Sequence, residues 1–451
     1  MNISLVDKSL VLNSARTCYS KDLVTPESRQ VSDKVRDSIL SSTLEASHLT
    51  TRQHKYYTFG ISGVSRSLVW LFLHSHPFYN TEEKSLRYVD ISSSIFHSKC
   101  KVGEEARTLY KDICKELFPI IEKRYKDIFP YRNTVNKYKT DVQHKVFENA
   151  RAIIPNGILT NLYHTISHLT LLRYYALSRH FSDEAQDLVD QMVNLVQDKE
   201  FLYDLDLVKE QEESFSFNTH YIIRYLPSQI MAREFSSLLV DYPRGRITDY
   251  DIIRFNKNSR RSSLNLYDYS DSNIHTYYEF DSTTSIACAI QQQRYRGINR
   301  DIFTIEIPGD LSSKGASDFI YFPKIFKELS SPLKLRIGQF LLQFHSGLSS
   351  EEFIYNLPNC WKVSYTESGN LVSFLHKWSQ RLCLNAQDEI WEISKSQWKQ
   401  VKEVHNLTID SFGAPCHIRQ ESNKKPFCPE GKRFCGIPVW KKDILQIERT
   451  L

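Results

Sequence analysis

The order of segments in the first half of the chain is repeated in the second half. A strand-and-helix segment, HKYYTFGISGVSRSLVWLFLHSH at residues 54–76, has a counterpart in TYYEFDSTTSIACAIQQQRYRG at residues 276–297. Further on, ENARAIIPNGILTNLYHT at 148–165 resembles EEFIYNLPNCWKVSYT at 351–366. Order and spacing are kept while identity is low, which is typical of an old internal duplication. The sequence therefore predicts two copies of one unit, with a boundary near residue 232 (1–231 and 232–451).

The length and the residue patterns support two α/β units. The chain has 451 residues, whereas a single hydrophobic core rarely grows beyond roughly 250–300 residues. Aromatic and β-branched strand patterns alternate with amphipathic helices, so we expect an α/β (α+β) fold with a mixed sheet and packed helices in each copy. A long helix is predicted over 104–126, and Pro119 is expected to kink it or end it early.

Composition limits the kinds of partner and compartment. The net charge of +5 is slight for this length, so extended nucleic-acid binding is not expected. The apolar run Leu68–Leu73 is too short to cross a bilayer. The first ten residues have no apolar core of signal-peptide type. We therefore expect a cytoplasmic protein that does not associate with membranes.

Polar side chains recur at matching places in the two copies, but each copy holds a different subset. The first copy has Ser75-His76-Pro77 followed after seven residues by Ser85-Leu86-Arg87-Tyr88, and later Ala150-Arg151 with Pro155. The second copy has Arg294-Tyr295-Arg296 but no downstream Ser and Arg-Tyr. It continues with Asn370, His376 and Arg381 ahead of Ala386-Gln387, a pair that resembles Ala185-Gln186 of the first copy.

These motifs resemble the signature of the flavin-dependent thymidylate synthases. That signature is Arg-His-Arg, seven residues, Ser, and then Arg-Tyr one residue later. The first copy keeps the central His76 and the Ser-x-Arg-Tyr part, and the second keeps the two flanking arginines with Tyr295 in place of the His. His54, Arg66 and the segment Ser14–Tyr19 are similar to the family's strand, helix and first loop.

The resemblance implies an activity and a set of ligands. Members of this family convert dUMP to dTMP, a methyl transfer that uses FAD, methylenetetrahydrofolate as one-carbon donor and NADPH as reductant. Carried over by position, the substrate-binding candidates are Glu83, Ser85, Arg87, Tyr88, Arg151, Gln291 and Arg294. The cofactor-binding candidates are Arg294, Tyr295, Arg296, Asn370 and His376. Arg381 is the catalytic candidate, because a guanidinium held against N3 and O4 of uracil stabilises the negative charge that activates C5.

Since neither copy holds all of these residues, we predict one composite site that draws on both copies and an inactive reciprocal site. Because active sites of this family lie between subunits, the fused chain is expected to form a homodimer that acts as a pseudo-tetramer. Two alternatives stay open: a catalytically inactive nucleotide- or flavin-binding protein, and one-carbon transfer to another pyrimidine nucleotide.

The tail carries Cys416-His417, Cys428 and Cys435. Three interpretations remain open here, namely zinc binding, a purely structural tail and redox pairing. The spacing lacks the close Cys-x-x-Cys pair of a zinc ribbon, so we assign no metal.

Overall fold

The computed structural model contains two units that share a topology. The described residues are 11–129 without 19, 22–23, 26–30, 47 and 77, then 137–210, 277–300, 304–305, 319–343, 350–405, and 413–448 without 422. We call residues 11–210 unit one and residues 277–448 unit two. The predicted boundary near 232 lies outside the described residues. Among the described helices, none combines the length and apolar character needed to cross a bilayer.

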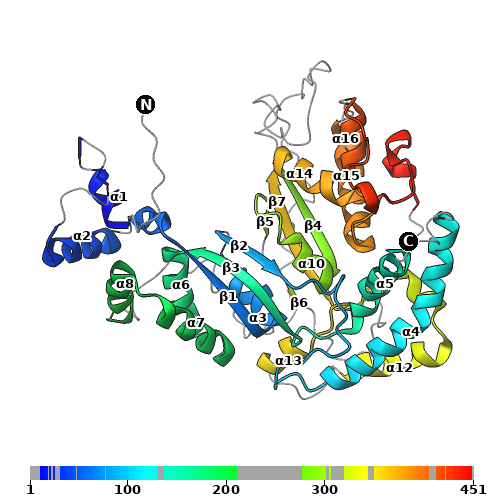
Figure 1. Ribbon diagram of the computed structural model, residues 1–451, viewed down its shortest axis with the longest axis horizontal. Coiled ribbons are helices and arrows are strands. Elements are labelled where there is room, and N and C mark those ends of the chain that lie inside the picture. Colours follow the sequence, from blue (N-terminus) through cyan, green and yellow to red (C-terminus); the bar gives the residue numbers. More distant parts are fainter. Residues whose placement is uncertain are drawn as a thin grey trace, which may run out of the picture.

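Unit one is built on a three-stranded antiparallel sheet (Figure 1). Its order is β1 (Tyr56–Ser65), β3 (Leu159–Ser167) and β2 (Tyr79–Glu83). The short helix α3 (Arg66–Leu68) and the π-helix η2 (Val69–Leu73) connect β1 to β2. The other helices of the unit are α1 (Val11–Thr17), α2 (Asp33–Glu45), η1 (Leu49–His54), α4 (Gly103–Ile128), α5 (Lys137–Ala150), η4 (Arg151–Ile153), α6 (His168–Ser178), α7 (Asp183–Leu195) and α8 (Lys199–Glu210).

Unit two repeats the plan around a sheet in which β7 (Lys362–Asn370) pairs with β4 (Tyr277–Ser285) and with the short strands β5 (Asn299–Arg300) and β6 (Thr304–Ile305). Helix α10 (Ile286–Gln292) follows β4, just as α3 and η2 follow β1. The remaining helices are η9 (Lys324–Glu328), α12 (Ser331–Leu342), α13 (Ser350–Asn356), α14 (Leu371–Arg381), α15 (Asp388–His405), α16 (Pro415–Glu421) and three single 3-10 turns in the tail, Gly431–Arg433, Val439–Lys441 and Ile444–Gln446.

A serine that ends each first strand fixes the equivalence of the two units. Ser65 donates from its backbone N and its Oγ to the Glu184 carboxylate, both at 2.7 Å. Ser285 makes the same pair of bonds to Glu389, the backbone one at 2.6 Å. Each serine also caps the helix that follows it. The start of α7 therefore corresponds to the start of α15, and Ala386-Gln387 precedes that helix. The equivalence expected between Ala185-Gln186 and Ala386-Gln387 is wrong by four residues.

After this serine, unit one has one residue more than unit two in the helical turn that follows. The turn between β1 and β2 continues as a π-helix from Val69 to Leu73, whereas α10 is α-helical throughout. A π-turn accommodates one more residue than an α-turn. As a result Ser65 corresponds to Ser285, but the helix-ending residue His74 corresponds to Gln293. His76 then falls at the position of Tyr295, as the motif comparison predicted.

The units join through two matching loops. Asn156 N donates to Leu357 O and Asn359 N to Ile154 O, both at 2.9 Å. Gly157 N donates to Tyr355 O and Cys360 N to Ala152 O, both at 2.7 Å. Pro155 and Pro358 form an isolated antiparallel bridge between them. Each bond is matched by its counterpart in the other unit, so the units face each other about a local pseudo-twofold axis.

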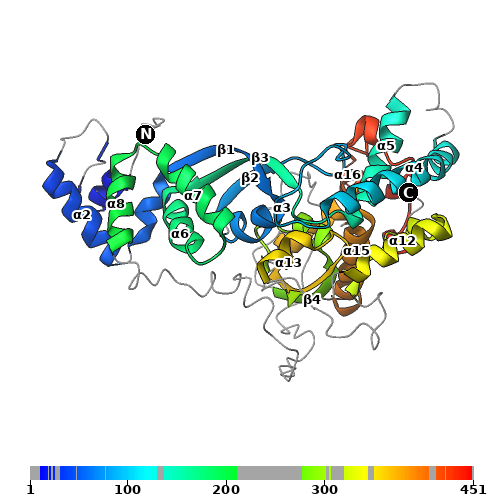
Figure 2. The ribbon, with the colours of Figure 1, turned by 90° about the horizontal axis from the view of Figure 1, so that it is seen from below.

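The described part of the chain contains three hydrophobic cores. One packs the unit-one sheet against α6, α7 and α8, and another packs the unit-two sheet against α14, α15 and the tail. The third contains residues of both units, from Trp70 and the helices α4 and α5 to α12, Leu357 and Trp361. Seen from below, α2 and α8 lie at one end of the elongated molecule and α4, α5 and α12 at the other (Figure 2).

Pro119 does not end the predicted helix early, because α4 runs through it to Ile128. The buried stripe of Leu109, Ile113 and Leu117 continues on Ile121, so packing in the shared core extends past the proline. Ser14 lies inside α1 rather than in a loop.

Candidate functional site

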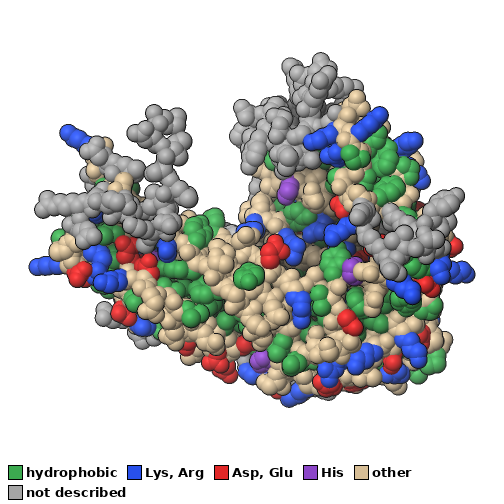
Figure 3. Space-filling model, in the orientation of Figure 1, with side chains coloured by type: hydrophobic (Ala, Val, Ile, Leu, Met, Phe, Trp, Pro, Cys, Tyr) green, Lys and Arg blue, Asp and Glu red, His purple; other side chains and the backbone are tan. Residues whose placement is uncertain are grey.

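A cavity of about 700 Å³ lies where the units meet. Its wall combines the loop after β2, helix α5, the end of α14 with the loop behind it, and the C-terminal tail. The side chains on which the argument rests are Arg87, Tyr88, His144, Glu148, Arg381, Asn385, Glu430 and Arg433. Figure 3 shows basic and acidic side chains together in the depression at the centre of this face. Residues far apart in the sequence thus line one space.

Arg87 is held by both units. It forms a short ion pair with Glu148 of α5, and its Nη2 donates to the Asn385 carbonyl at 2.9 Å. Ser85 shapes the turn, since its Oγ accepts from the Arg87 backbone N at 3.3 Å. Burial acts to lower the pKa of Arg87, but the Glu148 carboxylate outweighs it and the pKa is raised. Arg87 is therefore a fixed, compensated charge.

Arg151 is a buried charge that is only partly compensated. It follows α5 directly, and only 4% of its surface is exposed. Its Nε donates to the Glu148 carbonyl at 3.3 Å, whereas Nη2 has no hydrogen-bond partner among the described residues. Burial, followed by the nearby charge of Arg87, lowers its pKa to about 9. Since guanidinium stays protonated at neutral pH, the site holds an unsatisfied cation.

Arg381 comes from the other unit and has a similar unsatisfied atom. As the last residue of α14, it donates from Nη2 to the Gln291 carbonyl at 3.2 Å. Its guanidinium stacks over the Tyr295 ring at 5.0 Å. The Nε is buried without a partner among the described residues. Burial lowers the pKa of Arg381, and the charges of Arg87 and Arg294 act in the same direction. Such donors are suited to an anionic or carbonyl oxygen.

The end of α10 extends this surface. Tyr295 is buried between Arg381 and His376, whose ring meets it edge-on at 5.7 Å. Arg294 and Arg296 are both exposed. Arg296 crosses to unit one, where it donates to Asn80 at 3.1 Å and lies over Tyr79 at 5.2 Å.

Three of the predicted residues line the cavity, and others adjoin it. Arg87, Tyr88 and Arg381 are in the wall. Arg151 and Gln291 connect to it through the bonds above, and the Gln291 side chain also bonds to Gln387.

Glu83 and Asn370 are engaged elsewhere. Glu83 forms a buried ion pair with Arg66 at 2.9 Å. Asn370 caps α14, where its side chain accepts from the Ser373 backbone N at 2.9 Å.

Sequence comparison missed several wall residues. Glu148 stands three residues before Arg151, and its pairing with Arg87 over 61 positions has no local signal. His144 meets the Tyr88 ring edge-on at 5.0 Å. Asn385 accepts from Arg87 and donates to the Arg433 carbonyl at 2.7 Å. The helical spacing of His144 and Glu148 on α5 was the one available hint, because residues four apart share a helix face.

The positions in unit one that correspond to Arg381, Tyr295 and His376 hold different residues. Ser178 ends α6 where Arg381 ends α14. His76 is buried, and burial followed by the charge of Arg173 lowers its pKa to about 3. The pair formed by His76 and Arg173 replaces that of Tyr295 and His376. In unit one the arginine at this helix end, Arg179, stands one residue later than Arg381 does and pairs with Asp190.

Comparisons with known proteins agree with the motifs. The sequence profile of the family described as Thymidylate synthase complementing protein (Thy1) matches residues 4–200 and 274–406. A flavin-dependent thymidylate synthase from Clostridium tetani is 24% identical over 174 residues, 37% of this chain and 68% of that protein. One from Sulfurisphaera tokodaii is 31% identical over 162 residues, 35% of this chain. The chain spans about half the length of this second relative, 53%.

Among solved structures, two of Thymidylate Synthase X from Helicobacter pylori, each described as holding FAD and dUMP, are 17% identical with TM-scores of 0.29 and 0.28. They cover 45% and 49% of this chain and 93% and 96% of theirs. Those TM-scores are too low to support an argument. The family profile covers most of the chain in two segments, one in each unit, and the chain therefore belongs to the Thy1 family of flavin-dependent thymidylate synthases.

Proposed function

We propose that the chain is an FAD-dependent methyltransferase that converts dUMP to dTMP at one composite site between its units. The observation that carries this proposal is the guanidinium cluster. Arg87 of unit one and Arg381 of unit two line one cavity, and Arg151 lies outside its wall but close enough to Arg87 for that charge to lower its pKa. Arg151 and Arg381 each keep a buried N–H without a described partner. We also infer that the two units arose by tandem duplication and divided the ligand contacts between them.

The phosphate of dUMP fits the unit-one part of the cluster. A buried cation without full compensation lowers its free energy when an anion arrives, because the charge-assisted hydrogen bonds replace lost solvation. Arg151 supplies the free Nη2 atom. Arg87 is already neutralised by Glu148 and mainly fixes the geometry, with Ser85 and Tyr88 beside it. Glu83 contributes indirectly in this proposal, by holding Arg66.

The uracil ring is assigned to Arg381. C5 of uracil becomes nucleophilic when negative charge develops on N3 and O4, and a preorganised donor there stabilises that charge. Tyr295 below the guanidinium and the Gln291 carbonyl at its edge fix the orientation. No protein nucleophile is required.

The donor set at the end of α10 fits a flavin dinucleotide. Exposed Arg294 and Arg296 suit its diphosphate, while His376, Tyr295 and the amide of Asn370 lie along the same helix pair. When bound, FAD reduced by NADPH supplies the hydride, and methylenetetrahydrofolate supplies the carbon. Within the chain, Arg294 and Arg296 bind and orient, and the buried Tyr295 excludes water beneath Arg381.

Tritium release from C5-labelled dUMP, measured with FAD, NADPH and methylenetetrahydrofolate, tests the proposal. We expect Arg381→Ala to lower kcat/KM by about 100-fold or more, the usual effect of losing one preorganised donor, and Arg294→Ala to weaken binding. The matched control is Arg173→Gln, since Arg173 is the unit-one residue that corresponds to His376. This variant should keep its activity. Equal losses in all three variants would rule out a single composite site.

The proposal extends to the oligomeric state and the compartment. A chain that carries two units is expected to form a homodimer equivalent to a tetramer of single units and to work in the cytoplasm. A colourless protein that ignores added FAD and shows no tritium release, yet binds dUMP, would identify a nucleotide-binding relative instead.

A further inference from the structure

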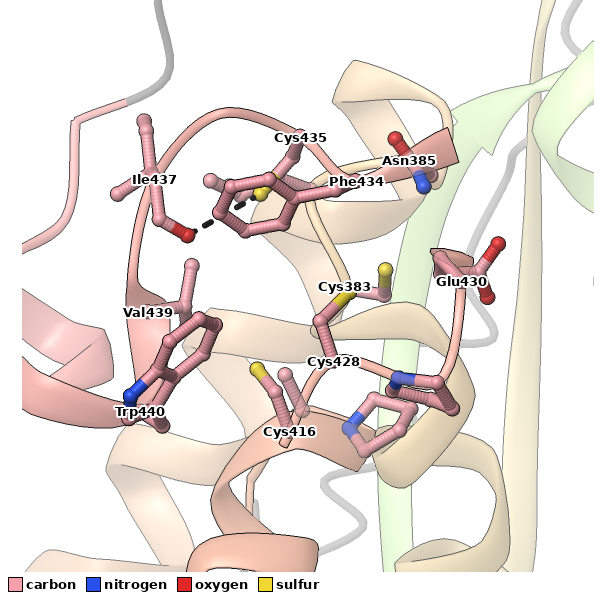
Figure 4. Close-up of a pocket in the computed structure, with 14 residues that line it drawn as sticks. Cys383, Asn385, Cys416, Cys428, Glu430, Phe434, Cys435, Ile437, Val439 and Trp440 are labelled. Atoms are coloured by element: carbon pink, nitrogen blue, oxygen red, sulfur yellow. Dashed lines mark hydrogen bonds between the residues drawn. The ribbon is translucent and has the colours of Figure 1, made fainter. Parts of the chain in front are cut away.

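Four cysteines meet in one small pocket beside the cavity (Figure 4). Cys383 comes from the loop after α14, Cys416 from α16, and Cys428 and Cys435 from the tail. The pocket has a volume of about 10 Å³, and most of its other lining residues are apolar, such as Leu384, Val439 and Trp440. All nine cysteines of the chain are free thiols. No sequence motif links Cys383 to the other three, because 32 residues separate it from Cys416.

The segments that carry the thiols are held in place by other contacts. Asn385 donates to the Arg433 carbonyl at 2.7 Å and so ties the loop after α14 to the tail. Cys416 and Val439 are buried in the unit-two core, and Cys428 and Cys435 pack against it. These contacts bring the four thiols together without any bond between the sulfur atoms.

The four thiols lie close enough together to affect one another's pKa. Burial raises the pKa of Cys416 to about 12, and the next causes are Cys383, Cys428 and Cys435. Burial likewise raises the pKa of Cys383 to about 11, with Glu430, Cys435 and Cys428 as further causes. Cys435 Sγ donates to the Ile437 carbonyl at 3.4 Å.

We propose that Cys383, Cys416, Cys428 and Cys435 bind one zinc ion in a closed tetrathiolate site that fastens the tail to the loop after α14. Four sulfur ligands are the set that structural zinc prefers. The pocket has room for roughly one water-sized probe, which suits a single ion.

Binding requires a local adjustment and releases protons. No three or more His, Cys, Asp and Glu side chains of the described residues are already placed to hold a metal. The thiols must therefore turn inward until each sulfur lies about 2.3 Å from the ion. Each ligand loses its proton to solvent on binding, so zinc affinity should fall as the pH is lowered.

The consequence of this site concerns the cavity wall. Cys383, Asn385, Glu430 and Cys435 line both the thiol pocket and the large cavity. A zinc ion between them would hold the tail residues Glu430 and Arg433 against the space next to Arg87. The site is independent of the proposed reaction, since it would form whether or not dUMP is turned over.

Metal analysis of the full-length chain, purified from zinc-supplemented medium, tests the proposal. We expect one zinc ion per chain, and loss of most of it in Cys428→Ser and in Cys383→Ser. The matched control is Cys114→Ser, a partly buried thiol on α4 that should keep the full zinc content. Cobalt substitution should give the thiolate charge-transfer and tetrahedral ligand-field bands in a difference spectrum.

A measurement on the unmodified protein covers variants that fail to fold. Removal of metal by a chelator should expose four additional thiols to a thiol reagent, and added zinc should protect them again. Absence of zinc in the pure protein together with no protection by added zinc would overturn the proposal. Iron with sulfide, or a disulfide between any two of the four cysteines, would also overturn it. None of these outcomes depends on tritium release.

Discussion

At the scale of single residues, Arg151 differs from an arginine that serves stability. Its Nη2 is buried without a described partner, whereas buried Arg52 donates to both Asp204 oxygens at 2.9 Å. Arg151→Met should therefore leave the free energy of unfolding unchanged or raise it, because an uncompensated charge is removed. The same variant should weaken dUMP binding by about tenfold or more, the loss of one charge-assisted hydrogen bond.

The control for this prediction is Arg52→Met, which should cost about 3–5 kcal/mol because buried Asp204 loses both hydrogen bonds from Arg52 and keeps only His168 as a described partner. Urea unfolding and nucleotide titration measure the two effects separately. If Arg151→Met destabilised the protein as much as Arg52→Met, Arg151 would be a structural residue.

The contribution of Glu389 to the free energy of unfolding should depend on pH. Burial raises its pKa from 4.5 to about 7, although the bonds from Ser285 act in the opposite direction. Because the folded-state pKa lies above the unfolded one, the stability from this group is fully present below pH 4.5 and is lost as the pH rises through 7. In urea unfolding across pH 4.5–8, Glu389→Gln should reduce this loss.

The comparison variant for Glu389 is Glu184→Gln, at the equivalent position of unit one. It replaces one of the two carboxylate oxygens that accept the same pair of serine bonds and a further bond from the Tyr355 hydroxyl. Identical pH profiles for the wild type and the Glu389→Gln variant would contradict the prediction.

At the scale of elements, two variants of Asn370 can distinguish its role in capping α14 from a role in ligand binding. Its side chain caps α14, so Asn370→Ala should lower the free energy of unfolding by about 1 kcal/mol. Asn370→Ser keeps a capping oxygen but lacks the amide, so stability should persist while FAD affinity falls. Thermal unfolding and flavin titration distinguish these effects. An unchanged FAD affinity in Asn370→Ser would limit Asn370 to capping.

Element order could be predicted from the sequence, but register could not be predicted everywhere. The strand-and-helix pattern and α4 follow from hydrophobic periodicity. The π-turn at Val69–Leu73 is set by packing in a fully buried segment, and no residue pattern announces it. The Ala-Gln comparison failed because a helix start is defined by its cap and first carboxylate. Here the shared feature is the Ser–Glu pair, whose members lie more than a hundred positions apart.

The candidate site shows the same limit. Arg87, Tyr88 and Arg381 could be found from motifs that each occupy a short stretch of chain. Glu148 and Asn385 could not, because their importance comes from contacts with Arg87, 61 and 298 positions away. Cys383 could not either, because the thiols that it meets lie 33 to 52 positions further along the chain. Long-range contacts of this kind leave no periodic signal.

At the scale of the whole molecule, the units should depend on each other for folding. One core includes Trp70 of unit one and Trp361 of unit two, and the loops around Pro155 and Pro358 satisfy each other's backbone groups. Residues 1–231 and 232–451 expressed separately should therefore aggregate, because each exposes a large apolar face. Co-expression should recover a soluble pair with tritium-release activity. Two halves that are soluble and monomeric alone would show that the shared core is dispensable.

The matched loops that join the units also affect how this protein can change over time. In a symmetric assembly of identical subunits, one codon change alters both sides of every subunit contact and every copy of the site. Here the two sides of the Pro155–Pro358 junction are encoded separately, so a substitution can be tried on one side while the other is held constant. Resistance to an inhibitor directed at the cavity could then arise in the Arg87 half or the Arg381 half independently.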